Sequence, residues 1–270
     1  MEVIITKRKH IAQVLILLAL TQGYLGFKQW KTAQQLDEAH AVYSDLETNP
    51  QDFHQLEDTP PMSALPVPSP SSPDASAPEY VFSYNPNPAS EFLQKNSDYV
   101  GHLYIPGTKI NYPMVRAQDN EYYLDHNFFR EKDALGSIFM DYRNIGMHLD
   151  KHTIIYGHYT ERGYMFGDLD KYLDKEYLLE NQIIEFSTPQ GVKFFKIFSI
   201  HISTKINSYL DTTFEKISFS DFVSTLSDIS LIEGLEKPDV TKQLLTLSTC
   251  NYAIKDGRLF VHAIEIDNPN

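Results

Sequence analysis

The residues best suited to chemistry lie in residues 244–264, LLTLSTCNYAIKDGRLFVHAI, which hold the only cysteine of the chain, Cys250, and eight residues later Arg258. A cysteine thiolate is a nucleophile, and an attack on an amide also needs a proton donor for the departing amine. An arginine is a permanent cation whose fork of N–H donors suits an oxyanion or a peptide carbonyl. We therefore weigh a thiol nucleophile with a cationic stabiliser against two plainer alternatives, a packed cysteine and a solvated arginine.

The position of the cysteine within its strand favours a reactive role. Side chains alternate along a strand, so Leu245 and Leu247 share one face while Thr246, Ser248 and Cys250 share the other. A cysteine with only a packing role is expected among the leucines. The thiol instead lies on the more polar face, at the end of the strand.

The best candidate for a proton donor is His158. Histidine is the usual general acid and base, and the chain has ten. His158 closes the apolar run HTIIYGH and so ends a strand, as Cys250 does. The others lie in the N-terminal segments, in loop-like stretches, or within or at the start of strands, where we expect structural roles. Two strand ends that carry a cysteine and a histidine can meet at one rim of a β-barrel, and the turn NYAIKDG would return Arg258 to the strand that bears the thiol.

The elements that must position these residues are mostly strands. Eight short runs rich in β-branched and aromatic residues predict strands at 99–106, 110–115, 136–141, 152–158, 182–188, 192–204, 242–249 and 258–266. Helical spacing predicts helices at 89–96, 120–128, 165–180 and 218–229, the last with a serine cap. Many strands with few helices indicate a mainly β fold closed into a barrel, because closure removes exposed edges.

The sequence before the barrel predicts a membrane-attached protein. Residues 1–10 are basic and would be the cytoplasmic N-terminus, and the uncharged residues 11–27 reach about 26 Å as a helix, which suits a transmembrane signal anchor. Residues 28–58 would form a helical stalk, and 59–88, which hold nine of the fifteen prolines, an extended linker. The catalytic domain would be 89–270, outside the cytoplasm. A cleaved signal peptide is the alternative.

Charge and cysteine content exclude several classes of protein. The net charge is −13, and 3 − 11 = −8 of it lies in residues 28–98, so nucleic acid is not expected as a partner. A single cysteine excludes an internal disulfide. Cys250 and His158 lack the spacing of paired metal ligands, and the acidic stalk has no calcium-loop pattern. We expect no metal and no cofactor.

Taken together, these motifs resemble those of class B sortases. The resemblance is carried by TLSTC ending at Cys250, by IIYGH ending at His158 with MFGDLDKY after it, and by Arg258 at the start of the last strand. DNEYYLDHNF, YLDTTF and the helix at 218–229 are similar too. The resemblance covers about residues 90–267. It implies an eight-stranded sortase-type β-barrel with short flanking helices and a helix between strands six and seven.

The resemblance also implies an activity, a membrane-anchored cysteine transpeptidase. Cys250 would attack the threonyl carbonyl of a C-terminal sorting signal in a secreted protein, and a thioester acyl-enzyme would form. An amine of a lipid II-type cell-wall precursor, or of a pilin lysine, would then resolve it. His158 would serve as general acid and then base, and Arg258 would hold the oxyanion or the substrate backbone.

Five further residues match positions of the family's peptide groove: Asn120, Leu124, Tyr156, Tyr209 and Ser248. Asn251 follows the cysteine where some class B enzymes have an acid. Two other functions stay open at this point: a surface cysteine peptidase that releases its product to water, and a non-catalytic anchored barrel that binds a ligand.

Overall fold

The computed structural model of the 270-residue chain describes residues 2–54, 88–146, 149–204, 206–251 and 257–269. It forms two compact units, Met1–Asp45 and Leu46–Asn270.

The first unit consists of one helix, α1 (Glu2–Ser44), which covers residues 11–27 and part of the predicted stalk. Among the described residues, none of the helices combines the length and the hydropathy that a membrane span requires. The predicted linker lies outside the described residues as far as residue 87.

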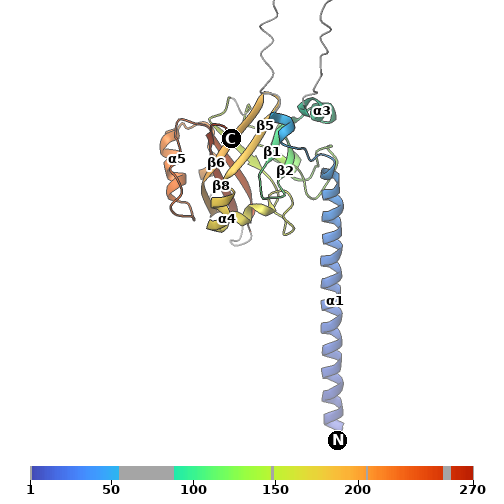
Figure 1. Ribbon diagram of the computed structural model, residues 1–270. Helices are drawn as coiled ribbons and strands as arrows, with labels where there is room; N and C mark the ends of the chain where they lie inside the picture. Colours follow the sequence, from blue (N-terminus) through green and yellow to red (C-terminus); the bar gives the residue numbers. More distant parts are fainter. Residues whose placement is uncertain (1, 55–87, 147–148, 205, 252–256, 270) are drawn as a thin grey trace, which may run out of the picture. The chain divides into compact units, whose positions relative to one another are not determined.

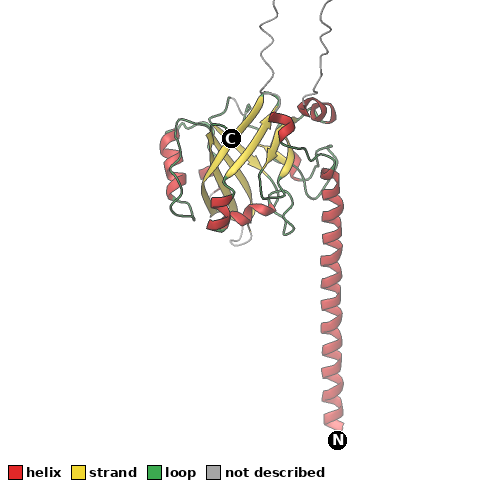
Figure 2. Cartoon of the chain, viewed as in Figure 1, coloured by secondary structure: helices red, strands yellow, loops and turns green. Residues whose placement is uncertain are grey.

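The second unit is a closed β-barrel of eight strands (Figures 1 and 2). The strands are β1 (Tyr99–Tyr104), β2 (Asn111–Val115), β3 (Ile138–Met140), β4 (His152–Tyr156), β5 (Ile183–Thr188), β6 (Gly191–Ser203), β7 (Leu244–Asn251) and β8 (Gly257–Ile266). Each predicted run coincides with one of them, so the mainly β, eight-stranded prediction is confirmed.

The order of strands around the barrel is β1-β2-β3-β4-β7-β8-β6-β5. The pairs β2–β3 and β4–β7 are parallel, and the other neighbours are antiparallel. Because β4 and β7 run in the same direction, their C-terminal ends lie at the same rim. The end of β4 precedes His158, and the end of β7 carries Cys250.

The α-helices of the barrel unit are α2 (Gln51–His54), α3 (Pro88–Lys95), α4 (Lys175–Glu180) and α5 (Phe219–Asp228). Short 3₁₀ helices accompany them within the described residues: η1 (Tyr122–Leu124), η2 (Gly167–Leu173) and η3 (Ile206–Tyr209). The predicted helix at 218–229 is confirmed as α5, capped by Ser218, whose hydroxyl accepts a hydrogen bond from the Asp221 amide.

The predicted helix at 120–128 was too long, since only η1 forms there. The Asn127 side chain explains the difference, because it accepts from the amides of Phe129 and Glu131. Such local bonds compete with a continuing helix. Asp119, just before the predicted start, accepts from the amides of Glu121 and Tyr122, as a helix cap does. Asp174 caps α4 in the same way and so divides the predicted helix at 165–180 into η2 and α4.

The connection from β6 to β7 covers the outside of the barrel. Figure 1 shows α5 beside β6, and its buried Phe222, Val223 and Leu226 pack with residues of β6, β7 and β8 in one core cluster, namely Phe198, Leu244 and Ile264. The polar face of β7 is therefore covered as well: Thr246 and Ser248 are as buried as the leucines beside them.

Residues ahead of the predicted linker also belong to the barrel unit. Leu46 and Phe53 are buried, and the Phe53 ring lies 5.6 Å from the ring of His102 in β1. The carbonyl of Thr48 accepts a hydrogen bond from Asn111 of β2 at 3.0 Å.

Candidate functional site

The strand ladder brings the predicted site residues to one rim. Cys250 pairs directly with Arg258 across β7 and β8, as the predicted antiparallel return required. On the other side of β7, Ser248 pairs with Tyr156 of β4. His158 and Cys250 each follow this last pair by two residues. For Cys250 the structure describes the strand position alone, so the distance from its sulfur to the His158 imidazole is not described.

Gly157 links the two parallel strands at the rim. Its amide donates to the Ser248 carbonyl at 3.3 Å, which extends the ladder beyond Tyr156. A Cβ at this position would lie 2.5 Å from Ile138 Cδ1 and 2.8 Å from the Phe166 ring. Only glycine therefore allows the chain to pass between these residues and deliver His158 to the rim.

The imidazole of His158 is held in one orientation. Its Nε2 lies 2.6 Å from the Leu124 carbonyl oxygen. A carbonyl only accepts, so Nε2 carries the hydrogen and donates it. Nδ1 is then the nitrogen that remains to exchange a proton with a reacting group.

A pocket of about 500 Å³ opens beside His158. It is lined by Asn120, Leu124, Phe139, Tyr142, Arg143, Tyr156, Gly157, His158, Leu210 and Arg258. Five of the predicted site residues, drawn from loops and strands far apart in the sequence, thus share one cavity: Asn120, Leu124, Tyr156, His158 and Arg258. A volume of this size suits a short peptide segment or a small molecule.

Two predicted groove residues do not line this pocket. Tyr209 ends η3, and its ring packs 4.4 Å from that of His201 and 5.5 Å from that of Phe260. It also packs against the core cluster of Ile154, Leu210 and Phe260, of which Leu210 lines the pocket. Ser248 is fully buried, and its hydroxyl has no hydrogen-bond partner within the described residues. Ser248 therefore lies behind the wall of the pocket, and Tyr209 packs on the cluster that contributes Leu210 to that wall.

The sequence did not identify one buried acid behind the pocket, Asp141. It directly follows β3, is 0% exposed, and accepts hydrogen bonds from three residues that line the pocket. Tyr156 donates its hydroxyl at 2.8 Å, Asn120 its amide at 3.0 Å, and Arg143 its Nε and Nη2 at 2.8 and 2.7 Å. The arginine–carboxylate pair is bidentate, which is the strongest common geometry for such a pair.

This arrangement fixes the charges of the wall. Burial by itself would raise the pKa of Asp141, but hydrogen bonds from Arg143 and Tyr156 outweigh it and hold the pKa below its usual range. Burial, and then the charge of Asp141, raises the pKa of the Tyr156 phenol. The wall thus presents a neutral phenol, an amide and a paired guanidinium near neutral pH.

Asp141 had a signal in the sequence. The run GSIFMD ends in an acid at a strand end, the same kind of position that singled out Cys250 and His158. Its bond to Tyr156 could not be foreseen, because it depends on the pairing of β3 with β4, in which Phe139 faces Tyr156. Arg143 lies two residues after Asp141 and had no such signal.

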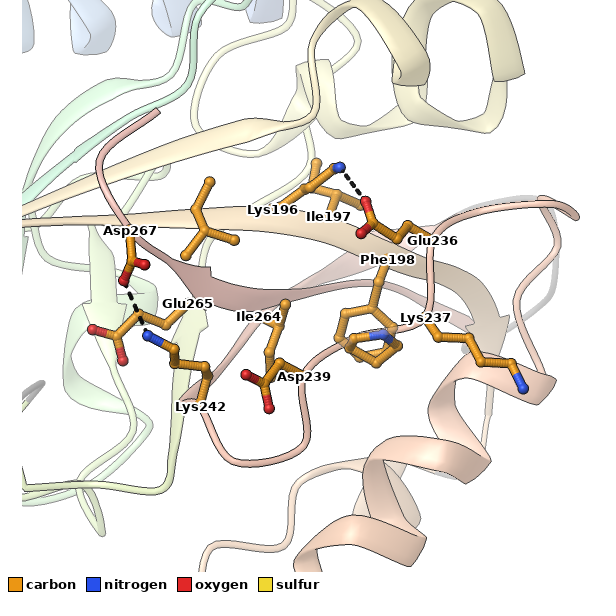
Figure 3. A pocket seen from close by; sticks show the side chains of 12 residues that line it. Lys196, Ile197, Phe198, Glu236, Lys237, Asp239, Lys242, Ile264, Glu265 and Asp267 are labelled. Carbon is orange, nitrogen blue, oxygen red and sulfur yellow. Dashed lines mark hydrogen bonds and ion pairs between the residues drawn. The ribbon is translucent and has the colours of Figure 1, made fainter. Parts of the chain in front are cut away.

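A second pocket, of about 400 Å³, lies on β6 and β8 near residues 236–242 (Figure 3). Ion pairs between Lys196 and Glu236, at 2.6 Å, and between Lys242 and Asp267, at 3.0 Å, lie along it. None of the predicted site residues lines it. In the described part of the chain no group of three or more histidine, cysteine or acidic residues is arranged to hold a metal ion.

Comparison with known proteins identifies the family of the chain. The family model described as Sortase domain matches residues 103–266. Sortase B of Listeria monocytogenes is 41% identical over 161 residues, which make up 59% of this chain and 65% of that protein. Sortase B of Staphylococcus aureus is 35% identical over 171 residues, or 63% of this chain and 70% of that protein.

A solved structure shares the fold as well. The Staphylococcus aureus sortase B–substrate complex superposes with a TM-score of 0.62 at 33% identity, over 67% of this chain and 85% of that one. The matched region thus spans slightly less than two thirds of the Listeria protein and most of the solved domain.

Proposed function

The chain belongs to the sortase family of cysteine transpeptidases, and we propose that it acts as a class B member that cleaves a C-terminal sorting signal after threonine and joins the product to an amine. The observation that carries the proposal is the shared rim: β4 and β7 run in parallel to His158 and Cys250, and β8 returns Arg258 directly opposite the cysteine.

In the first half of the reaction, the Cys250 thiolate attacks the threonyl carbonyl carbon, and the developing oxyanion is stabilised by the cation of Arg258. The C–N bond then breaks, and the departing amine takes a proton from His158. The orientation of the imidazole supports Nδ1 as the atom that gives it, because Nε2–H is bonded to the Leu124 carbonyl. The product is a thioester on Cys250.

In the second half, an acceptor amine attacks the thioester carbonyl. Nδ1 of His158 takes the proton that the amine loses, the C–S bond breaks, and the thiolate is restored. Atoms and charge balance without a metal or a cofactor. We propose a lipid II-type cell-wall precursor or a pilin lysine as the source of the amine.

The sorting peptide would bind in the 500 Å³ pocket, where Asn120, Leu124 and Tyr156 line the wall. Tyr209 would act through its packing against the cluster that contains Leu210. Ser248 would act from behind the wall, through its carbonyl, which accepts from the Gly157 amide.

A surface location remains a proposal from the sequence pattern alone. A basic segment followed by uncharged residues 11–27 would hold the chain at the membrane with its N-terminus in the cytoplasm and the barrel outside. Protease added to intact cells should then digest an epitope tag at the C-terminus, and protection of that tag until lysis would contradict this location.

Transpeptidation can be tested with a peptide pool that carries one fixed threonine, with and without hydroxylamine as the amine. Wild-type chain should form a hydroxamate at the threonine and release little free acid, whereas a peptidase would release the acid in both cases. Cys250→Ala and His158→Ala should abolish product formation while melting like the wild type. Activity retained by Cys250→Ala would remove the mechanism.

A further inference from the structure

Three side chains that line the candidate pocket share one buried anchor. Asp141 accepts five hydrogen bonds: two on Oδ1, from the Arg143 amide and Nε, and three on Oδ2, from Arg143 Nη2, Asn120 Nδ2 and the Tyr156 hydroxyl. Their lengths run from 2.7 to 3.0 Å. A carboxylate has about four lone-pair sites, so this one is saturated.

The anchor joins three separate segments of the chain. Asn120 precedes η1, Asp141 and Arg143 follow β3, and Tyr156 ends β4. The backbone fixes the anchor itself, because the Asp141 amide donates to the Ile154 carbonyl at 2.9 Å. Asn120 is fixed at both ends of its amide, since its Oδ1 also accepts from the Tyr142 amide at 3.0 Å. Three flexible side chains are thereby held in single orientations before any ligand arrives.

We propose that Asp141 is a positioning residue that preorganises the substrate-binding wall of this pocket, acting through Tyr156, Asn120 and Arg143 rather than by touching the substrate. The proposal rests on the proposed function, because it takes the pocket as the sorting-peptide site. Preorganised groups bind more tightly because the entropy of ordering them is lost on folding rather than on binding.

The decisive variant is Asp141→Asn. It keeps the shape of the side chain but replaces an acceptor oxygen with an NH₂ group, which opposes the N–H and O–H donors of Arg143 and Tyr156. We expect the KM for the peptide to rise about tenfold, which corresponds to 1.4 kcal/mol. We expect kcat to change by less than about twofold at a temperature well below melting, because an effect on binding moves KM alone.

A matched control separates positioning from lost stability. Asp168 is also largely buried, and it accepts from Lys171 Nζ and from the Lys109 amide, both at 2.9 Å, but it does not line the pocket. Asp168→Asn should lower the melting temperature and leave KM near the wild-type value. If both variants raise KM in proportion to their loss of stability, Asp141 has no positioning role.

A double-mutant cycle in catalytically inert Cys250→Ala chain tests the route through Tyr156. The dissociation constant of a peptide that the wild type converts is measured with Tyr156→Phe, Asp141→Asn and both together. Because Asp141→Asn already breaks the hydrogen bond to Tyr156, adding Tyr156→Phe to it should change the dissociation constant by less than about twofold. An effect of Tyr156→Phe that is as large in the Asp141→Asn chain as in the parent chain would overturn the proposal.

The two hypotheses fail in different ways. Wild-type chain that binds the peptide pool but forms no hydroxamate contradicts the transpeptidase and leaves the positioning role standing. Wild-type chain that is active while Asp141→Asn keeps the wild-type dissociation constant contradicts the positioning role alone. The Cys250→Ala chain should bind the peptides that the wild type converts. If it binds none of them, the pocket is not the peptide-binding site, and the positioning role of Asp141 fails with it.

Discussion

At the scale of single residues, backbone hydrogen bonds place the three residues of the proposed reaction, Cys250, His158 and Arg258. Arg258 lies opposite Cys250 in the β7–β8 ladder and also lines the pocket. His158 lies beyond the end of β4 and is oriented by the Leu124 carbonyl. Each position follows from strand register, so a small change of side chain tests a role without moving the fold.

Arg258→Lys should cost about 10²-fold in kcat, the order of loss that follows removal of one oxyanion donor. Lysine keeps the positive charge but not the planar fork of donors. The measurement is kcat for hydroxamate formation by the purified variant.

The control for this variant is Arg162→Lys, at an exposed position that does not line the pocket. It should behave as the wild type. Full activity in Arg258→Lys would show that Arg258 is a surface cation without a role in stabilising the oxyanion.

At the scale of elements, the sheet that carries the site also carries a row of buried histidines. The Asp211 carbonyl accepts from His152 Nδ1 at 2.7 Å, so in the neutral ring His152 Nε2 accepts, and Thr246 donates to it at 2.7 Å. The Thr246 oxygen then accepts from His262 Nδ1 at 2.8 Å. This one-way chain requires His152 to be neutral, and it joins β4, β7 and β8.

The stability of the barrel should therefore fall in acid. Burial lowers the pKa of His152 and of His201 to about 4, and it also holds the pKa of His262 well below its usual range. Each of these histidines has a lower pKa in the folded chain than in the unfolded chain, where it is near 6.5. Above pH 6.5 the ring is neutral in both states and the fold keeps its full stability. As the pH falls from 6.5 toward 4, the unfolded chain takes up the proton first, and stability is lost. Urea midpoints should drop over this window.

His201→Phe should flatten the drop. Neither ring nitrogen of His201 has a hydrogen-bond partner within the described residues, and its ring stacks on that of Phe260 at 5.0 Å. Phenylalanine keeps the stacking without the cost of protonation, which is at most about 3 kcal/mol for a shift of this size. Equal slopes in wild type and variant between pH 6.5 and 4.5 would contradict this explanation.

Much of this element-level picture could be predicted from the sequence, and the reasons show where prediction ends. All eight strands were predicted because runs such as VKFFKIFSIHIST combine β-branched and aromatic residues between turn signals. The predicted helix at 120–128 was too long because the Asn127 side chain accepts from the amides of Phe129 and Glu131, which competes with helical continuation. The Asp141 anchor was missed because it depends on three segments that only the closed barrel brings together.

At the scale of the whole molecule, the barrel unit starts before the proline-rich residues. Leu46 and Phe53 are each 1% exposed, and Thr48 bonds to Asn111 of β2 through its carbonyl and to His102 of β1 through its hydroxyl, at 3.0 and 3.2 Å. A short segment at 46–54 thus completes the surface of the domain that holds the site.

Chain that begins at residue 89 should be less stable than chain that begins at residue 46. Without Leu46 and Phe53 the domain loses, as an upper bound, about 3–6 kcal/mol of the free energy of unfolding that burial of these side chains contributes. For a domain of this size that corresponds to a melting temperature lower by about 6 °C or more.

Phe53→Ala in the full chain is the point-mutant version of the same test and should cost about 3 kcal/mol or more. Phe27→Ala, at an exposed position in α1, serves as its control. Equal melting of the two truncated chains would show that residues 46–54 add nothing to the domain.

The central claim is that Cys250 becomes acylated by the peptide it cleaves. Wild-type chain is mixed with a converted peptide without an amine, quenched in acid, and analysed by intact and tandem mass spectrometry. The account predicts an adduct with the mass of the peptide up to threonine, on Cys250 only, that hydroxylamine removes. An adduct on any other side chain, or turnover that proceeds with Cys250 replaced by alanine, would contradict it.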